Sequence, residues 1–211
     1  MSGKAGRTRE MLYMFLHAPP GPGGPVPEYR VQGGMILLAK SPIDFDLDLE
    51  YGPDLRRSAG LSGAIRDGIM SGHVTESVVG GRPGYALGAE GIKAAEDCWR
   101  GADRRIRDDI ACVKEIMDGM TYEETMLFMA VSFPEYLDEP GIRAGLADVR
   151  VDAACSLFKK DKGTIAKCAA IAGFAYQDFV TLLLARGIEP YEVTKEDEER
   201  VMRTIHLLAD A

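Results

Sequence analysis

Residues 163–187 decide how this chain is organised: Gly163-Thr-Ile-Ala-Lys-Cys-Ala-Ala-Ile-Ala-Gly173-Phe-Ala-Tyr-Gln-Asp-Phe-Val-Thr-Leu-Leu-Leu-Ala-Arg-Gly187. Thr164 is placed to cap the start of a first helix, and Gly173 can adopt the left-handed conformation that ends it. Ala169 lies four residues before Gly173, where a larger side chain would push two crossing helices apart. The stretch therefore predicts two helices joined by a tight turn.

The apolar residues after that turn indicate how the second helix packs. They fall at Phe174, Phe179 and Leu182. Phe179 and Leu182 are three residues apart, so we expect them to share the inner face of the second helix. An Ala-x-x-x-Gly step followed by this spacing is typical of a helix-turn-helix. The alternative is a packed helical hairpin that binds no nucleic acid.

Length and composition fit one or two globular domains. The chain has 211 residues, of which 46% are hydrophobic, enough for a substantial core. No apolar run reaches the roughly 20 residues that a membrane span needs. The apolar run Met11–Leu16 is too short for a signal peptide. We therefore expect a cytoplasmic protein without a membrane partner.

Charge is unevenly distributed along the chain. The net charge is −8, and residues 101–150 hold 11 acidic and 6 basic side chains, a net of −5. An acidic protein binds phosphate backbones poorly unless basic residues cluster locally. Three such clusters occur: Arg56, Arg57 and Arg66; Arg104, Arg105 and Arg107; and Lys159, Lys160, Lys162 and Lys167.

Metal and cofactor chemistry finds little support. The four cysteines, Cys98, Cys112, Cys155 and Cys168, form no close pair, and the three histidines are scattered. We expect buried free thiols, no metal site and no cofactor. No nucleophile–base pair or phosphate loop has usable spacing, so an enzyme ranks third among the hypotheses.

The N-terminal half predicts a helix followed by a β-hairpin. A helix over Arg9–His17 should place Leu12, Phe15 and Leu16 on one face. In the segment up to Ser71, Leu61, Ile65 and Ile69 recur every four residues and predict a buried stripe. Strands are expected at 72–79 and 85–88, with a turn over 80–84 that puts Arg82 at its tip. Residues 45–51 alternate apolar and acidic side chains and also predict a strand. A helix followed by a hairpin with a basic tip is the outline of a winged helix.

The C-terminal half predicts further helices. Thr121 and Glu124 form a capping-box pattern at the start of one helix. A second helix is expected over 146–160 and an acidic closing helix over 196–209. Pro134 and Pro140 interrupt the chain between the helix that begins at Thr121 and the helix over 146–160. We therefore expect a mainly α protein with a winged-helix-like domain over 1–135 and a helix-turn-helix domain over 136–211.

The motif region resembles a known family. The run from Leu157 to Gly173, followed by Phe179, Leu182-Leu183 and Arg186-Gly187-Ile188, resembles the prokaryotic uncharacterised protein family 0175. The likeness covers about residues 140–193 and implies a small, antitoxin-like helix-turn-helix protein. The family usually has a polar residue on the exposed start of the second helix, where this chain has Ala175-Tyr176-Gln177.

The N-terminal half carries a weaker likeness. Tyr51-Gly52-Pro53, Gly72-His73-Val74, Tyr85-Ala86-Leu87 and Glu90-Gly91 resemble winged-helix proteins of the YwgA and Panacea type. The usual Thr after the second strand is Gly88 here. This resemblance implies a regulator or a toxin–antitoxin component and implies no catalysis.

The leading hypothesis is a DNA-binding regulator or antitoxin-like protein. The lysines at 159, 160, 162 and 167 would contact phosphates, which mainly position the protein on DNA. Tyr176, Gln177 and Thr181 would face bases, and Gln177 could pair with an adenine edge. Arg82 would enter a minor groove, and Arg57 and Arg66 should lie off the buried stripe.

The alternative hypothesis is a protein-interaction module. Tyr176, Val180 and Leu184 recur every four residues, and this side of the second helix is unusually apolar for a DNA reader. The acidic segment 101–150 would suit a basic partner such as a toxin. We expect Tyr176, Val180 and Leu184 to be covered by protein in the assembly, most simply across a homodimer interface.

Overall fold

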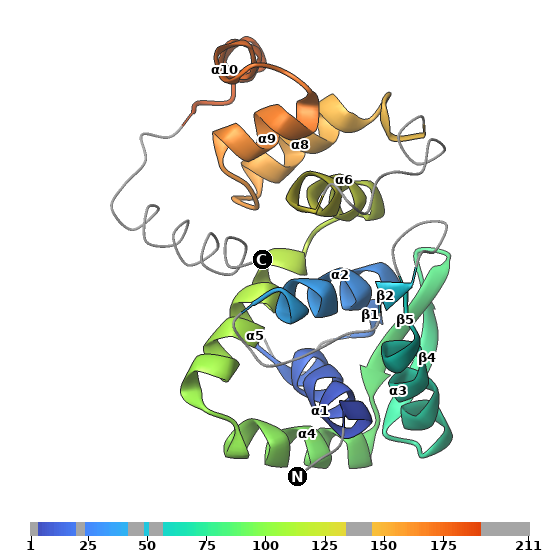
Figure 1. Cartoon of the computed structure of the whole chain (residues 1–211). Helices are drawn as coiled ribbons and strands as arrows, with labels where there is room; N and C mark the ends of the chain where they lie inside the picture. The colour runs from blue at the N-terminus through green and yellow to red at the C-terminus, as the bar shows by residue number, and fades with distance from the viewer. Residues whose placement is uncertain (1–3, 20–23, 42–48, 51–56, 134–144, 191–211) are drawn as a thin grey trace. The chain divides into compact units, whose positions relative to one another are not determined.

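The computed structural model describes residues 4–19, 24–41, 49–50, 57–133 and 145–190, with the side chains of 4–5, 49–50 and 57 excepted. The chain is mainly helical and divides into two compact units (Figure 1). The first unit ends at Asp118 and the second begins at Gly119. This division precedes the boundary at 135 expected from the sequence, because helix α6 (Tyr122–Ser132) packs against α8 (Arg150–Lys159) and α9 (Ile165–Ala172). The two units are described separately.

In the residues that the structure describes, the first unit combines five helices with short antiparallel strands. The helices are α1 (Lys4–His17), α2 (Glu28–Ala39), α3 (Ala59–Met70), α4 (Ala89–Gly101) and α5 (Arg104–Met117). A three-stranded sheet has the order β1-β5-β4, formed by β1 (Val26–Pro27), β5 (Arg82–Leu87) and β4 (Val74–Val79). Strands β2 (Leu49–Glu50) and β3 (Arg57–Ser58) make a separate antiparallel pair. Of the strand expected over 45–51, residues 45–48 and 51 lie outside the described part.

Helix α1 is the centre of the first unit. Every residue from Met11 to Leu16 is buried, not only the predicted face of Leu12, Phe15 and Leu16. The reason is that α1 contacts α2, α3, α4, α5 and β5, and a helix surrounded in this way must be apolar on all sides. The contact with α2 is so close that a Cβ on Gly34 would overlap the Phe15 ring.

The hairpin turn is tighter than the sequence suggested. Val79 pairs with Arg82, so only Gly80 and Gly81 form the loop, with φ angles of +57° and +79°. Two positive φ values are what a two-residue hairpin turn of the favoured twist requires. Arg82 therefore begins strand β5 instead of standing at the tip of a longer turn, which corrects the prediction.

The buried stripe of α3 is shorter than predicted. Leu61 and Ile65 are buried, whereas Ile69 is 36% exposed. Gly68 takes the place of a third inward residue, because a Cβ there would collide with the Val74 side chain. The helix begins where the Ser58 hydroxyl accepts a hydrogen bond from the Leu61 amide. Burial thus follows the close approach of α3 to β4.

The described part of the second unit contains α6, α8, α9 and α10 (Tyr176–Ala185). Helices α6, α8 and α9 pack against one another, and α10 packs against α9. The predicted capping box is present at α6: the Glu124 amide donates to Thr121 Oγ1, and the Thr121 amide donates to Glu124 Oε2. Helix α8 buries Ala153 and Leu157, while Val149 precedes the helix and is 36% exposed. The predicted closing helix over 196–209 lies outside the described residues.

Candidate functional site

The turn between α9 and α10 is fixed by its backbone. The Thr164 hydroxyl accepts a hydrogen bond from the Lys167 amide, which confirms the predicted cap. Gly173 has φ +75°, and its amide and that of Phe174 donate to the carbonyls of Ala170 and Ala169. This pair of bonds is the Schellman motif, which ends a helix at a left-handed residue. The two helices meet at 92°.

Arg150 closes the same turn from α8, a contact that the sequence did not reveal. Its Nε donates to the Ile171 carbonyl at 3.2 Å. The guanidinium lies where a Cβ of residue 173 would be, so any other residue there would displace Arg150 as well as strain the backbone. The turn therefore depends on both the positive φ of Gly173 and the space that Arg150 fills.

Helix α10 is anchored by Phe179, as predicted, and by Leu183, next to the expected inner residue Leu182. Phe179 and Leu183, four residues apart, are fully buried, and Ile188 is buried with its amide bonded to the Leu183 carbonyl. Leu182 is half-buried, and Phe174 is 42% exposed. At a crossing near 90°, the inner face of α10 contains positions 179 and 183, so Leu182 lies at its margin.

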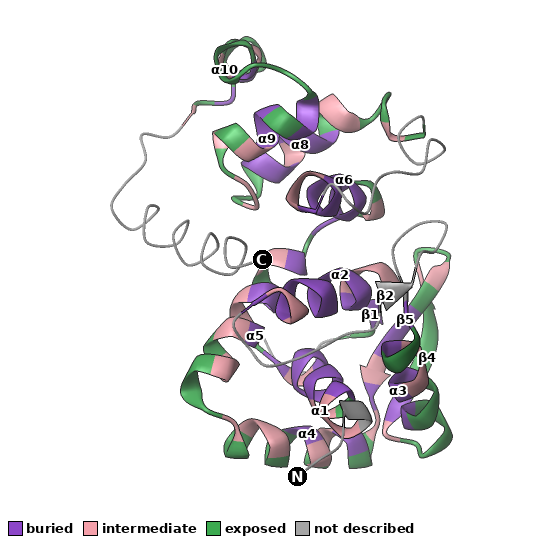
Figure 2. Ribbon diagram, in the orientation of Figure 1, coloured by how far each residue is buried: buried purple, intermediate pink, exposed green. Residues whose placement is uncertain are grey.

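The outward face of α10 mixes polar and apolar side chains. Gln177 and Thr181 are exposed, as are Tyr176 (49%) and Leu184 (57%), while Val180 is half-buried (Figure 2). The Thr181 hydroxyl donates to the Gln177 carbonyl at 2.9 Å. Thr181 therefore meets an external group mainly as an acceptor, whereas both ends of the Gln177 amide face outward.

Lys160 forms part of the helix packing. Its ammonium lies 2.8 Å from both carboxylate oxygens of Glu124 and 2.9 Å from the Gly119 carbonyl. Glu124 is 3% exposed. Burial alone would raise the pKa of Glu124, but hydrogen bonds from Lys160, Ser156 and the Thr121 amide outweigh it and hold the pKa below its ordinary value. The pair ties α6 to α8, which makes Lys160 a poor phosphate ligand.

Lys167 also turns inward. Its ammonium donates to Ser132 Oγ at 2.7 Å and lies 5.1 Å from the centre of the Phe128 ring. Burial lowers the pKa of this lysine, and the neighbouring Cys168 opposes that shift only partly. Burial, followed by the nearby Cys155, raises the pKa of the Cys168 thiol to about 12. The predicted cluster of four lysines is thus not a single basic surface.

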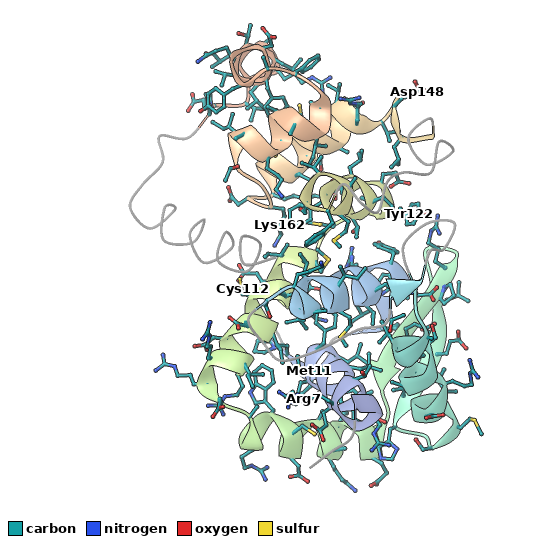
Figure 3. All side chains as sticks on the ribbon, viewed as in Figure 1. Arg7, Met11, Cys112, Tyr122, Asp148 and Lys162 are labelled. Atoms are coloured by element: carbon teal, nitrogen blue, oxygen red, sulfur yellow. The ribbon has the colours of Figure 1, made fainter. Side chains whose placement is uncertain are left out.

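Lys159 and Lys162 remain on the surface side of the second unit. Lys159 is exposed at the end of α8. Lys162, which is half-buried, lies in the turn that leads to α9 (Figure 3). Asp161 lies between them, with a positive φ of 54°. Arg186 is held at 2.6 Å by Asp152. Positive charge near α10 is therefore modest.

The predicted arginines of the first unit occupy different elements. Arg66 is exposed on α3, and Arg82 is half-buried at the start of β5. Arg57 belongs to β3, and its side chain lies outside the described part. These arginines do not form one cluster on a single helix.

The described residues contain no group of three or more His, Cys, Asp or Glu side chains that could hold a metal ion. All four cysteines are free thiols. No single helix in the described ranges is long and apolar enough to cross a membrane, although α9 and α10 pass the same test when taken together across their bend.

Three partner residues were not predicted from the sequence. Arg150 bonds to the turn, Glu124 pairs with Lys160, and Ser132 accepts a hydrogen bond from Lys167. Glu124 was visible only as a cap, and nothing in its spacing from Lys160, 36 residues away, indicates an ion pair. Comparison with known protein families, curated proteins and solved structures gives no match.

Proposed function

We propose that the protein binds double-stranded DNA through a helix-turn-helix formed by α9 and α10, as a regulator or antitoxin-like protein. The observation that carries this proposal is the 92° helix pair with its left-handed glycine at 173. A second helix projected in this way can enter a major groove while the first crosses the backbone. Its exposed face presents Gln177, whose amide can form two hydrogen bonds with an adenine.

The start of α10 supports the same proposal. Ala175 provides no side-chain cap. The first amide groups of an uncapped helix attract a phosphate oxygen, which would set the depth of α10 in the groove. Lys159, which is exposed at the end of α8, is the lysine best suited to add a phosphate contact.

The first unit supports a regulator by its element order. It runs α1, β1, α2, β2, β3, α3 and then the β4–β5 hairpin, with β1 paired to β5. A helix followed by a hairpin that pairs with an earlier strand is similar to the outline of a winged helix, which supports the proposal. Arg66 on α3 is the exposed basic side chain that would meet DNA in such a domain.

The experiment that tests the proposal is selection of binding sites from random double-stranded DNA with the full chain. We expect one enriched sequence, with an affinity that falls steeply as salt rises. Lys159→Glu should reduce the log–log salt slope by about one, the value for one lost phosphate contact. Lys93→Glu is the matched control, since Lys93 is an exposed lysine of α4 whose side chain is 70% accessible. No enriched sequence, or equal effects of the two variants, would contradict the proposal.

A second candidate function is binding of a protein through α10. Three large apolar side chains in and just before this helix are strongly exposed: Phe174, Tyr176 and Leu184 at 42%, 49% and 57%. Exposed apolar residues gathered on one helix are typical of an interface. The candidate partners are a second copy of the chain, as in the predicted homodimer, or a basic protein such as a toxin.

Sedimentation distinguishes these two functions. If α10 forms a homodimer interface, Leu184→Asp should produce monomers. Met70→Asp, in the first unit at a residue that is 81% exposed, should leave the dimer intact. If the wild-type protein is a monomer at all concentrations, the homodimer hypothesis is contradicted.

A further inference from the structure

Strand β4 forms an open edge of the sheet in the first unit. The strand order is β1-β5-β4, so among the described residues β4 pairs with β5 on one side and with no strand on the other. The opposite edge is short and protected, because β1 contains two residues and the second is Pro27. β4 is six residues long and pairs with β5 without a bulge from Val74↔Leu87 to Val79↔Arg82.

The ladder determines which backbone groups face outward. The Gly88 amide donates to the His73 carbonyl at 2.8 Å. Backbone groups alternate in an antiparallel pair, so those of residues 73, 75, 77 and 79 point toward β5. Pro83, which has no amide hydrogen, lies opposite Val78, as this alternation requires. The amides and carbonyls of Val74, Glu76 and Val78 consequently point away from β5.

Most side chains of the edge are exposed. Thr75, Glu76 and Ser77 are exposed, and Val78 is 78% exposed (Figure 2). Natural edges are commonly protected by proline, a bulge or charged side chains, and of these β4 has a single charged residue and neither proline nor bulge. Its charged residue is Glu76, on the same face as Val78. Arg82, which pairs with Val79, belongs to the other face.

The position of Glu76 disfavours a second copy of the strand as the occupant. A symmetric antiparallel pair that uses all the outward groups would match residue 74 with 78 and residue 76 with itself. Two carboxylates would then lie directly opposite each other, which is destabilising. A basic residue at that place would instead be attracted.

We propose that β4 is a docking edge for an extended basic segment of another protein, which adds to the sheet as an antiparallel strand. A lysine or arginine of the partner lies opposite Glu76. β-branched residues two positions on either side face Val74 and Val78. Backbone hydrogen bonds supply binding, and the charge at residue 76 supplies the choice of partner.

The test uses the full chain and the peptide Val-Thr-Lys-Thr-Val with blocked ends. Amide exchange measured by NMR should be fast at Glu76 and Val78 in the free protein and slower with the peptide. Exchange at Thr75, Ser77 and Val79 should already be slow, since these amides bond to β5. Methylation of the peptide's lysine and valine amides should abolish binding, whereas methylation of its threonine amides should preserve it.

Charge reversal provides the matched control. Glu76→Lys should weaken binding of the lysine peptide about fivefold and favour the same peptide with glutamate at its centre. Lys93→Glu, at an exposed residue of α4, should leave the preference unchanged. The proposal is overturned if the peptide leaves exchange at Glu76 and Val78 unchanged, or if Glu76→Lys leaves the preference unchanged. It is also overturned if those amides are protected in a concentration-dependent way without peptide, which would identify a second copy as the occupant.

Discussion

Each unit of this protein packs a lysine ammonium against a phenylalanine ring, but the two ammonium groups have different polar partners. In the first unit, Lys114 lies 5.4 Å from the centre of the Phe15 ring and 3.9 Å from an Asp118 oxygen. In the second, Lys167 lies 5.1 Å from the Phe128 ring and donates to a serine hydroxyl. Burial lowers the pKa of both, and this shift is opposed by the Asp118 carboxylate at Lys114 and by Cys168 at Lys167. The number of lysines in a segment therefore does not indicate which of their ammonium groups are exposed to solvent.

The largest expected effect compares glycines of the two units. A Cβ at Gly91 would overlap the His73 carbonyl, and one at Gly173 would overlap Arg150 at a positive φ. Gly91→Ala should cost roughly 3 kcal/mol of unfolding free energy, because a backbone atom must move. Gly173→Ala should cost roughly 2 kcal/mol, since the flexible arginine can shift but the strained φ remains.

The measurement is urea unfolding followed by two signals. Trp99 is the single tryptophan and lies in α4, so its fluorescence follows the first unit, whereas circular dichroism follows both. Gly63→Ala is the control, since nothing lies within 4 Å of its Cβ position, and it should stabilise α3 by about 0.5–1 kcal/mol. Equal effects at all three glycines would contradict the described packing.

The next effect concerns the ion pair between Lys160 and Glu124. Lys160→Met leaves a carboxylate that is 3% exposed without its cation and should cost about 2 kcal/mol, less than for a fully buried pair because Lys160 is 35% exposed. The folded-state pKa of Glu124 is lowered, so its stabilisation is present above the ordinary glutamate pKa and is lost as pH falls through the folded value. Acid titration of the dichroism signal should show a loss that begins at higher pH in the variant. An unchanged acid transition would contradict a stabilising role for the ion pair between Lys160 and Glu124.

A smaller effect on unfolding free energy should distinguish Lys167 from Lys114. Lys167→Met removes a half-buried ammonium that has no carboxylate partner among the described residues, and it should stabilise the second unit by roughly 1 kcal/mol. Ser132 keeps its bond to the Phe128 carbonyl. Lys114→Met should be close to neutral, because it also removes the attraction to Asp118. A lowered lysine pKa means that stability rises as pH increases toward the ordinary lysine value, and Lys167→Met should remove that rise.

The smallest effect concerns helix caps. Thr164→Ala removes the cap of α9 and Ser58→Ala the cap of α3, and each should cost about 1 kcal/mol. Ser58 is the more buried of the two, so its loss leaves the Leu61 amide less accessible to water and should cost more. A larger loss of unfolding free energy for Thr164→Ala than for Ser58→Ala would contradict the expected effect of burial on the caps.

Local rules predicted much of the fold. The cap at Thr164, the left-handed Gly173 and the capping box at Thr121 depend on residues within four positions of each other, and all three are confirmed. The hairpin was expected, although its turn was narrower. Such features are visible in sequence because the interacting groups are neighbours in the chain.

Tertiary contacts account for what the sequence could not show. Leu182 gives way to Leu183 as the inner residue of α10 because the crossing angle decides which positions face inward. Ile69 is exposed because Gly68 brings α3 close to β4. Lys160 and Lys167 are paired with groups more than 30 residues away in the sequence. None of these contacts has a local signature.

The most direct test of the DNA-binding proposal is the base preference of a Gln177→Ala variant. The selected site is varied one base pair at a time, and the affinity of the full chain is measured for each. We expect the variant to lose about 1–3 kcal/mol on the best site and to relax its preference at one adenine position only. Thr164→Ala, away from the bases, should lower affinity at every site alike. A Gln177→Ala variant that retains both the affinity and the preference of the wild type would contradict readout by α10.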